Sequence, residues 1–415
     1  MAFRSVFIAL VIGTALLVAA FMINWYRPRA VTDQPSAALV RASGKCAECH
    51  ANMQFSVVHE YEMSAHARNN VNCLQCHQPA GGQQGKDHHG FTIAAGLTAA
   101  NCRACHEAEY QQYARSRHSS PSWAAVYGEK GVKEAGLSDE QVEQIERYHP
   151  KSVKRPPNAL VSLEGPAAVG AGCVSCHVVG KPNADGSVGN CTACHTRHTS
   201  SVEVARLPTT CGQCHMGPDH SQLEIYEESK HGVLFQAQRK LLNLAAPPKK
   251  LTSRDMFVPT CATCHMSGLN GGKVTHDPAE RLSYNLFAEV TDKRKNYDQA
   301  QAAMKDVCRN CHTQPTVDRV YTQAEQVVTA TNKKVESARS IIDGLRKDNL
   351  LGKPFSQPID FAYFDLWHYY GRTSKHGAFM GGADFVQWHG NYPILKHTVE
   401  LQAMAAELRR AHGKK

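Results

Sequence analysis

The feature that most constrains this chain is a short motif, Cys-x-x-Cys-His, which occurs eight times in 415 residues. All 16 cysteines belong to it. The motifs are Cys46-Cys49-His50, Cys73-Cys76-His77, Cys102-Cys105-His106, Cys173-Cys176-His177, Cys191-Cys194-His195, Cys211-Cys214-His215, Cys261-Cys264-His265 and Cys308-Cys311-His312. This spacing is typical of covalent haem c attachment, in which both thiols bind one porphyrin and the histidine binds its iron. The sequence therefore predicts eight covalently attached haem c groups.

Single Cys-x-x-Cys pairs also occur in zinc sites, redox-active dithiols and disulfides. Eight copies with no cysteine left over favour haem attachment over these alternatives. The chain has only 7 % aromatic residues. Haem groups would add apolar surface to its core and so compensate for the small number of large side chains. The formal charge of +9 does not indicate a nucleic-acid partner, because the propionates of eight haems would bring about sixteen negative charges.

The N-terminus carries an apolar run of 18 residues, Val6 to Ile23, followed by Trp25 and Tyr26. This length spans a bilayer, and the aromatic pair suits the membrane interface. The segment 1–30 therefore predicts a membrane anchor, and a signal sequence cleaved near Ala20 is the alternative. Both place the chain on the periplasmic side of the cytoplasmic membrane or free in the periplasm, since c-type cytochromes are assembled there.

The rest of the chain divides into three predicted parts. Residues 31–45 predict a linker, residues 46–315 an octahaem-binding domain, and residues 316–415 a helical C-terminal domain that supplies distal-ligand and subunit-interface residues.

Apolar residues recur at helical spacing in two long segments of the C-terminal part. They predict helices over 321–345 and 393–412, and a capped segment at 138–148 predicts a shorter helix. The Gly-, Asn- and Asp-rich stretch 180–190 predicts turns. No stretch shows a clear strand alternation. The predicted fold class is a mainly α multihaem cytochrome c fold with little or no β-sheet.

Histidines are abundant, and 15 of the 23 lie outside the motifs. A haem that only transfers electrons takes a second axial histidine, whereas a haem that does chemistry needs an open position. The best distal candidates lie in short polar contexts: His66, His89, His118, His198, His231, His276 and His389. Their rivals are His59, His88 and His376. Seven candidates for eight irons fit seven bis-histidine haems and one open iron.

With these motifs the chain resembles the octahaem hydroxylamine oxidoreductase family from Cys46 to about Tyr392. The most specific stretches are CTACHTRH at 191–198, CGQCHMGPDHSQLEIYEESKHG at 211–232 and WHGNY at 388–392. The resemblance implies that the fourth motif, which ends at His177, attaches the haem whose iron is open.

The resemblance also implies a pocket beside that haem. The family's Asp-His pair after a Cys-x-x-Cys-His-Met-Gly-Pro segment matches Asp219 and His220. A histidine there exchanges protons with the substrate, and the neighbouring aspartate orients it. The family's pocket tyrosine is assigned here to Tyr321.

Family members that oxidise hydroxylamine carry a tyrosine, supplied by a neighbouring subunit, that is covalently linked to the catalytic haem. The matching segment here is Asp384 to Gly390, with Phe385 at the tyrosine position and Tyr392 nearby. Because phenylalanine has no phenolic oxygen, the resemblance implies the family's reductive members, which reduce nitrite and hydroxylamine to ammonium. It further implies a homotrimer.

Two other functions stay open. One is hydroxylamine or hydrazine oxidation, with electrons running outward, and the other is a pure electron conduit with eight six-coordinate irons. The expected partners are nitrite or hydroxylamine and a redox protein such as a membrane quinol-oxidising cytochrome.

Overall fold

The computed structural model describes residues 12–20, 22, 44–148 and 154–413. The chain divides into two compact units, Met1–Cys73 and Leu74–Lys415, and each is described by itself. The expected domain boundaries at residues 30, 45 and 315 stay predictions.

The predicted anchor lies only partly within the described residues. Residues 12–20 and 22 are helical, and the remainder of the run 6–23 lies outside them. Among the helices that are described, none is both long and apolar enough to cross a membrane.

The first unit consists of three described helices, α3 (Gly44–Met53), α4 (Phe55–Met63) and α5 (Ala65–Arg68). Helix α3 carries the whole first motif. The hydroxyl of Ser64 accepts a hydrogen bond from the Ala67 backbone N–H at 3.0 Å, which caps α5. The cap fixes the start of the helix that carries His66.

The second unit begins with helix α6 (Cys73–His77) and a small hairpin of strands β1 (Gly85–His88) and β2 (Phe91–Ala94). The strands pair antiparallel, with His88 opposite Phe91. Both turn residues have positive φ, 52° at His89 and 82° at Gly90, the conformation whose twist suits a two-residue hairpin. This one small sheet agrees with the prediction of little or no β-sheet. The sequence did not locate it, because strands of four residues are too short to show an alternating pattern.

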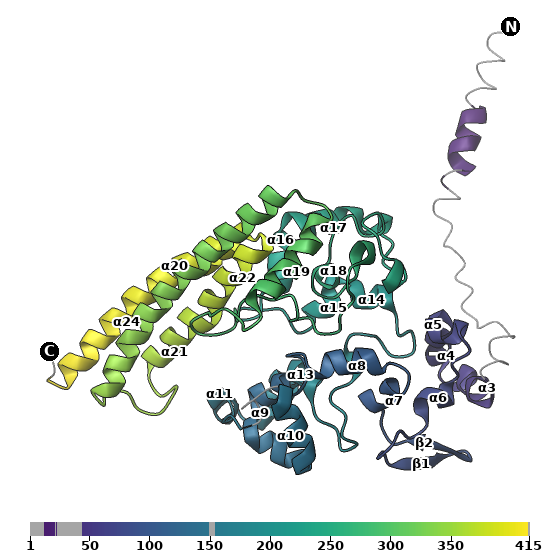
Figure 1. Cartoon of the computed structure of the whole chain (residues 1–415), viewed down its shortest axis with the longest axis horizontal. Helices are drawn as coiled ribbons and strands as arrows, with labels where there is room; N and C mark the ends of the chain where they lie inside the picture. The colour runs from purple at the N-terminus through teal and green to yellow at the C-terminus, as the bar shows by residue number, and fades with distance from the viewer. Residues whose placement is uncertain (1–11, 21, 23–43, 149–153, 414–415) are drawn as a thin grey trace, which may run out of the picture. The chain divides into compact units, whose positions relative to one another are not determined.

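Short helices and turns follow, coloured blue to green in Figure 1. Their bounds are α7 (Ala99–Arg103), α8 (Glu107–Ala114), α9 (Ser120–Glu134), α10 (Asp139–Tyr148), α11 (Ala159–Glu164), α12 (Pro166–Ala171), α13 (Cys173–His177), η1 (Val178–Gly180), η2 (Cys191–Ala193), α14 (Val202–Arg206), α15 (Pro208–Gly212), α16 (Gln222–Glu228), α17 (Lys230–Gln238), η3 (Arg239–Leu241), η4 (Pro248–Lys250), α18 (Cys261–His265), η5 (Leu269–Gly271) and α19 (Tyr297–Arg309).

Three motifs are themselves single helical turns: α6, α13 and α18 each begin at the first cysteine and end at the histidine. Residues three apart on a helix lie on one face, so both thiols point toward the same side. The predicted helix at 138–148 is confirmed as α10, and its start is capped by reciprocal hydrogen bonds between Ser138 and Gln141.

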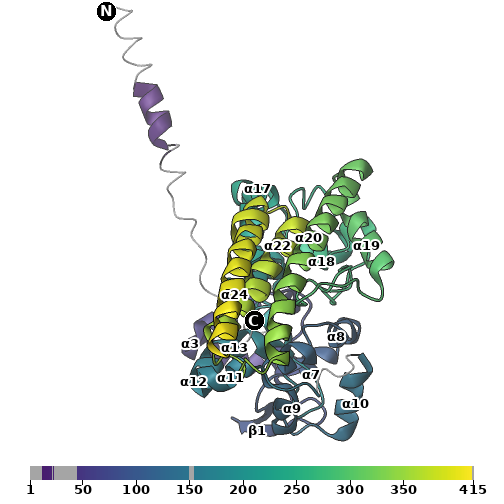
Figure 2. The same ribbon diagram turned by 90° about the vertical axis from the view of Figure 1, so that its left-hand side faces the viewer.

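The C-terminal part is built on two long helices, α20 (Gln314–Lys347) and α24 (Tyr392–Ala411), which confirm the two predicted helices. They run side by side in both views (Figures 1 and 2). Between them in sequence lie α21 (Pro358–Phe364), η6 (Asp365–Gly371), α22 (Arg372–Met380), α23 (Ala383–Val386) and η7 (Gln387–Asn391). The expected fold class, mainly α with a single small hairpin among the described residues, is confirmed.

One face of α20 forms the main side-chain core of this part. Its buried positions include Val328, Val335, Ile342 and Leu345, spaced by three, four or seven residues as a stripe facing a neighbouring helix requires. They pack with residues such as Ile394 at the start of α24. This core anchors the segment 358–391, which contributes to the site described below.

Replacing Ile342, which is 1 % exposed, with alanine should lower the free energy of unfolding by about 2–4 kcal/mol, because it removes methyl groups and leaves a cavity. Val320→Ala on the same helix is the matched control, since that side chain is 40 % exposed, and it should change stability by less than about 0.5 kcal/mol. Guanidinium unfolding of the haem-loaded protein, followed by far-ultraviolet circular dichroism, measures both. Equal losses would show that α20 is not packed as described.

Candidate functional site

None of the 16 cysteines, all of which lie in the described part of the chain, forms a disulfide bond. Within the second unit, sulfur atoms of different motifs approach one another closely. The neighbouring pairs are Cys102 with Cys191, Cys211 with Cys261, and Cys176 with Cys214. The attachment sites of the third and fifth, sixth and seventh, and fourth and sixth motifs are therefore adjacent in space.

Motif histidines are held in the protonation form that an iron ligand needs. His177 donates from Nδ1 to the backbone oxygen of Ser122 at 2.6 Å, and His265 donates from Nδ1 to that of Pro278 at 3.1 Å. A carbonyl oxygen only accepts, so the proton is on Nδ1 and the lone pair is on Nε2. Such bonds orient metal-binding histidines in general.

Four of the predicted distal histidines lie opposite a motif histidine of a different part of the sequence. The ring centroids are separated by 6.5 Å for His77 and His198, 6.4 Å for His195 and His276, 5.9 Å for His231 and His312, and 5.7 Å for His118 and His215. Metal–imidazole bonds are about 2 Å long, so two imidazoles on one metal have centroids about 6 Å apart. The residues present therefore fit bis-histidine haem.

The other three candidates are less defined. His66 is half-buried on α5, and its rival His59 stacks on Phe55 at 5.5 Å. His89 is exposed in the hairpin turn, whereas its rival His88 is half-buried. The choice within each pair stays open.

His389 lies on η7 with a side chain that is 60 % exposed, and its Nδ1 is 2.6 Å from Asp384 Oδ2. Its rival His376 is buried on α22 and donates from Nδ1 to the backbone oxygen of Arg372 at 2.9 Å. Here too the distal ligand stays a prediction.

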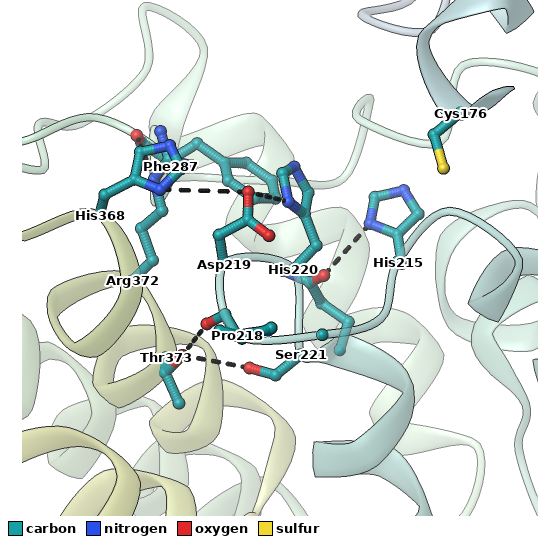
Figure 3. A network of polar contacts seen from close by, with 12 residues as sticks. Cys176, His215, Pro218, Asp219, His220, Ser221, Phe287, His368, Arg372 and Thr373 are labelled. Carbon is teal, nitrogen blue, oxygen red and sulfur yellow. Dashed lines mark hydrogen bonds and ion pairs between the residues drawn. The ribbon is translucent and has the colours of Figure 1, made fainter. Parts of the chain in front are cut away.

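The predicted pocket pair, Asp219 and His220, lies in the loop between the sixth motif and α16 (Figure 3). The His220 ring is 6.5 Å from the ring of His177, the histidine of the fourth motif, and 6.2 Å from that of His215. The first separation equals that of His77 and His198, and what distinguishes His220 is that it lies near two motif histidines and has its Nδ1 2.6 Å from Asp219 Oδ2. The structure thus brings together the residues that the resemblance assigned to one site, although the fourth and sixth motifs are separate in sequence.

The loop is held against helix α22. The hydroxyls of Ser221 and Thr373 are 3.1 Å apart, and Thr373 also donates to the backbone oxygen of Pro218 at 3.2 Å (Figure 3). These bonds flank Asp219 and His220 on both sides, so the C-terminal helices determine where the pair points.

Asp219 connects two histidines. Its Oδ2 is 2.6 Å from Nδ1 of His220 and 4.0 Å from Nδ1 of His368. Burial would raise the pKa of the Asp219 carboxyl, but the hydrogen bond and charge of His220, with smaller contributions from His368 and Arg372, outweigh burial and lower it. Asp219 is therefore an ionised acceptor that fixes the orientation of His220.

His368 lies on the π-helical turn η6, an irregularity frequent at functional sites. Burial, and next the charge of Arg372, lower its pKa to about 3, so its ring is neutral at pH 7. Its buried Nδ1 has no hydrogen-bond partner within the described residues. The Phe364 ring stacks on it at 4.2 Å. A neutral, buried imidazole whose Nδ1 has no partner can form a hydrogen bond with a bound polar molecule.

The sequence did not single out His368 or Arg372 for the pocket. His368 was one of 15 histidines without a motif, and Arg372 lies 153 positions after Asp219. Only the folding of η6 and α22 onto the loop reveals them. The one signal available was the aromatic run around His368, WHYYG, which is unusual for an exposed helix.

Tyr321, the predicted pocket tyrosine, lies on α20 with its ring 5.7 Å from that of Phe379 and 4.9 Å from Lys305 Nζ. Burial, and next the nearby Cys308 of the eighth motif, raise its pKa. The tyrosine that lies beside the Asp219 cluster is Tyr369, whose ring is 5.5 Å from that of His368. Burial, with the Asp365 and Asp219 charges, raises its pKa.

The segment expected to carry a cross-linking tyrosine has its side chains in two settings. The Phe385 ring is 7 % exposed and stacks on His389 at 5.0 Å, so it faces its own chain. Tyr392 is 52 % exposed and lies 5.4 Å from the Trp388 ring. In this segment Tyr392 is therefore the tyrosine accessible to another subunit.

Residues 69–356, more than half of the chain, match the family model described as "Seven times multi-haem cytochrome CxxCH". A curated relative from Kuenenia stuttgartiensis, described as a probable nitrite reductase-hydroxylamine oxidoreductase fusion protein, is 23 % identical over 85 % of this chain. The chain spans 43 % of that relative.

Two solved structures share the fold. A hypothetical multiheme protein superposes with a TM-score of 0.74 at 20 % identity, covering 90 % of this chain and 99 % of that one. A chain of the Kuenenia stuttgartiensis reducing HAO-like protein complex superposes with a TM-score of 0.65 at 21 % identity, covering 90 % of this chain and 86 % of that one. Together these matches confirm the family resemblance inferred from the motifs. The chain therefore belongs to the multihaem cytochromes, whose Cys-x-x-Cys-His motifs attach c-type haem covalently.

Proposed function

We propose that this cytochrome reduces nitrite, and also hydroxylamine, to ammonium at the haem attached by Cys173 and Cys176. The observation that carries the proposal is the cluster of His220, Asp219 and His368 beside His177, the histidine of that motif. When bound, a haem with one open axial position supplies an iron that binds the nitrogen compound and conducts electrons to it. The protein has to supply protons, hold the substrate in position and limit the access of water to it.

In this proposal His220 delivers protons to the bound substrate from Nε2. Its Nδ1 is committed to Asp219 at 2.6 Å, which fixes the ring orientation and keeps the other nitrogen available. Phe287, whose ring is 5.1 Å from that of His220, limits water on one side. The neutral His368 donates or accepts a hydrogen bond at the far side of Asp219.

The remaining motifs are proposed to form the supply of electrons. Eight haems, seven of them with two histidine ligands, are proposed for the eight motifs. The adjacency of the sulfur atoms of the fourth and sixth, and of the sixth and seventh motifs supports a continuous path that ends at the fourth. A chain of nearby cofactors allows a multi-electron reduction without release of intermediates.

Relatives support the nitrogen chemistry. One is described as a nitrite reductase-hydroxylamine oxidoreductase fusion and another belongs to a reducing complex. We further propose export to the periplasmic side of the membrane, where haem c is attached, and delivery of electrons by a membrane quinol-oxidising cytochrome.

A homotrimer is also proposed. Four exposed apolar side chains on η7 and α24 are spaced by three or four residues, as in a helix-packing stripe. They are Trp388, Tyr392, Leu395 and Val399, between 52 % and 65 % exposed.

One specific observation favours the alternative function, the oxidation of hydroxylamine. Tyr392 is exposed on this stripe and carries the phenolic oxygen that Phe385 lacks. If Tyr392 were bonded to a neighbouring haem, hydroxylamine oxidation would replace reduction as the proposed activity.

Replacing His220 with alanine should lower nitrite turnover by about 10²-fold, the usual scale for a group that donates protons. Ammonium formed from nitrite with a reduced viologen as electron donor measures the turnover. Haem content should stay unchanged, because His220 attaches no haem. The control is His412→Ala, at the exposed end of α24, which should keep full activity. Full activity in the His220 variant would remove the proton-delivery role.

Carbon monoxide should bind to one iron in eight of the fully reduced protein, because seven irons have two histidine ligands in this proposal. Intact mass gives the number of haems, and an optical titration gives the number of carbon monoxide molecules bound. The pure electron conduit predicts no binding at all, so a chain with eight haems and no carbon monoxide adduct would reject the enzymatic function.

Tyr392→Phe should leave the spectrum of the reduced haems and the subunit mass unchanged, because the proposal includes no tyrosine–haem bond. Denaturing mass spectrometry should show separate chains for both proteins. A covalent trimer that the substitution abolishes, together with loss of a red-shifted ferrous band, would establish the oxidative alternative.

A further inference from the structure

A cavity of about 1190 Å³ lies behind the pocket. His368 and Arg372 line it, and His368 Nδ1 is 4.0 Å from Asp219 Oδ2. The remaining lining comes from the stretches 115–121, 155–158, 277–296 and 354–355, from residues of α20 and α21, and from Trp367. The lining includes exposed residues such as Lys293 and Lys295, so the cavity connects the surface with the Asp219 cluster.

This cavity is not a haem-binding site. Among the described residues that line it there is no motif cysteine and no motif histidine. A covalently attached haem contacts both of its cysteines and its axial histidine, so these three residues must line its binding site. We therefore infer that the cavity is open to solutes rather than filled by a haem.

The lining is strongly basic. Nine arginine and lysine side chains face the cavity, against five carboxylates. Arg339 and Arg346 are compensated, since both lie 3.5 Å from Asp343. Lys293 and Lys295 are exposed and make no ion pair within the described part of the chain. The excess positive charge is thus partly at the accessible edge, where it attracts anions from solution.

The surroundings of Arg372 orient its guanidinium so that it can bind an anion. Its guanidinium lies 5.3 Å from the centre of the Phe287 ring and 5.1 Å from that of Trp367. Nε donates to the backbone oxygen of Phe287 at 3.0 Å, which fixes the plane of the group. No described residue accepts a hydrogen bond from its two terminal nitrogens. Those two donors match the paired oxygens of a small oxyanion.

We propose that this cavity is an entry vestibule selective for small anions, in which basic side chains at the edge collect the anion and Arg372 binds it beside the Asp219 cluster. The inference rests on the proposed function, and it specifies which of the two proposed substrates the site favours. Nitrite is an anion at pH 7, whereas hydroxylamine is neutral. The vestibule accelerates the capture of nitrite and does nothing for hydroxylamine.

The test uses the haem-loaded full chain and two iron ligands of similar size. Azide, an anion, is mixed with the oxidised protein, and carbon monoxide, which is neutral, with the reduced protein. Stopped-flow spectra give the association rates between low and high salt. The azide rate should fall by about tenfold or more as salt screens the vestibule, and the carbon monoxide rate should stay constant.

Two sets of variants locate the effect. Lys293→Ala/Lys295→Ala should slow azide association by about two- to fivefold at low salt, because two vestibule charges are lost. The matched control, Lys249→Ala/Lys250→Ala, removes two exposed lysines outside the cavity lining and should leave the rate unchanged.

Arg372→Gln should weaken azide binding and raise the KM for nitrite by about tenfold, with the KM for hydroxylamine unchanged. Arg372→Lys keeps the positive charge but loses the planar pair of donors, so its azide affinity and its KM for nitrite should lie between those of the wild type and Arg372→Gln.

The outcomes separate the two proposals. Binding of azide with a salt-independent rate overturns the vestibule and leaves the proposed function intact. Equal effects of the two lysine pairs overturn the vestibule as well. Wild-type affinity in Arg372→Gln removes Arg372 from the anion site. Failure of both azide and carbon monoxide to bind overturns the proposed function, and the vestibule with it.

Discussion

The structure depends on one constraint: two thiols and one imidazole must converge on the same haem wherever a Cys-x-x-Cys-His motif attaches one. One helical turn meets this requirement, and α6, α13 and α18 consist of little else. The chain around them is therefore divided into short helices and turns. Opposing histidines such as His77 and His198 come from separate segments, so an iron bound between them would also join distant parts of the chain.

Ordinary side-chain packing is concentrated in two places. One core lies beside the seventh motif and includes Leu251, Met256 and Val258. The larger one lies along α20, where Ile342 and Leu345 are almost fully buried. That helical part is the scaffold on which α22 and η6 are held. The site thus needs both kinds of structure, because the motifs supply His177 and the helices supply Arg372 and His368.

The sequence predicted the parts that depend on local spacing. The motifs, the long helices α20 and α24 and the capped helix α10 all have short-range signatures, and the family resemblance added Asp219 and His220. His368 and Tyr369 had only the aromatic run around them and Arg372 had none, because they reach the site through tertiary contacts such as Ser221–Thr373 and Thr373–Pro218. The hairpin at 85–94 was missed since its strands are four residues long. Tyr321 stays a prediction, because no motif spacing fixes the position of the pocket tyrosine in the sequence.

Asp219 resolves an electrostatic conflict at the centre of the site. A carboxylate beside an anion-binding position repels the anion, and at an effective dielectric constant near 20 two charges 4 Å apart interact by about 4 kcal/mol. Here the carboxylate is 2.6 Å from His220 Nδ1 and 4.0 Å from His368 Nδ1, and the charge of Arg372 also stabilises it. Arg372 retains two donors for an anion, because no described residue accepts a hydrogen bond from its terminal nitrogens. Burial and Arg372 keep His368 neutral, so that His368 can donate or accept a hydrogen bond without adding a charge to the site. In the proposed reaction, Arg372 would therefore bind nitrite while His220 supplies protons to it.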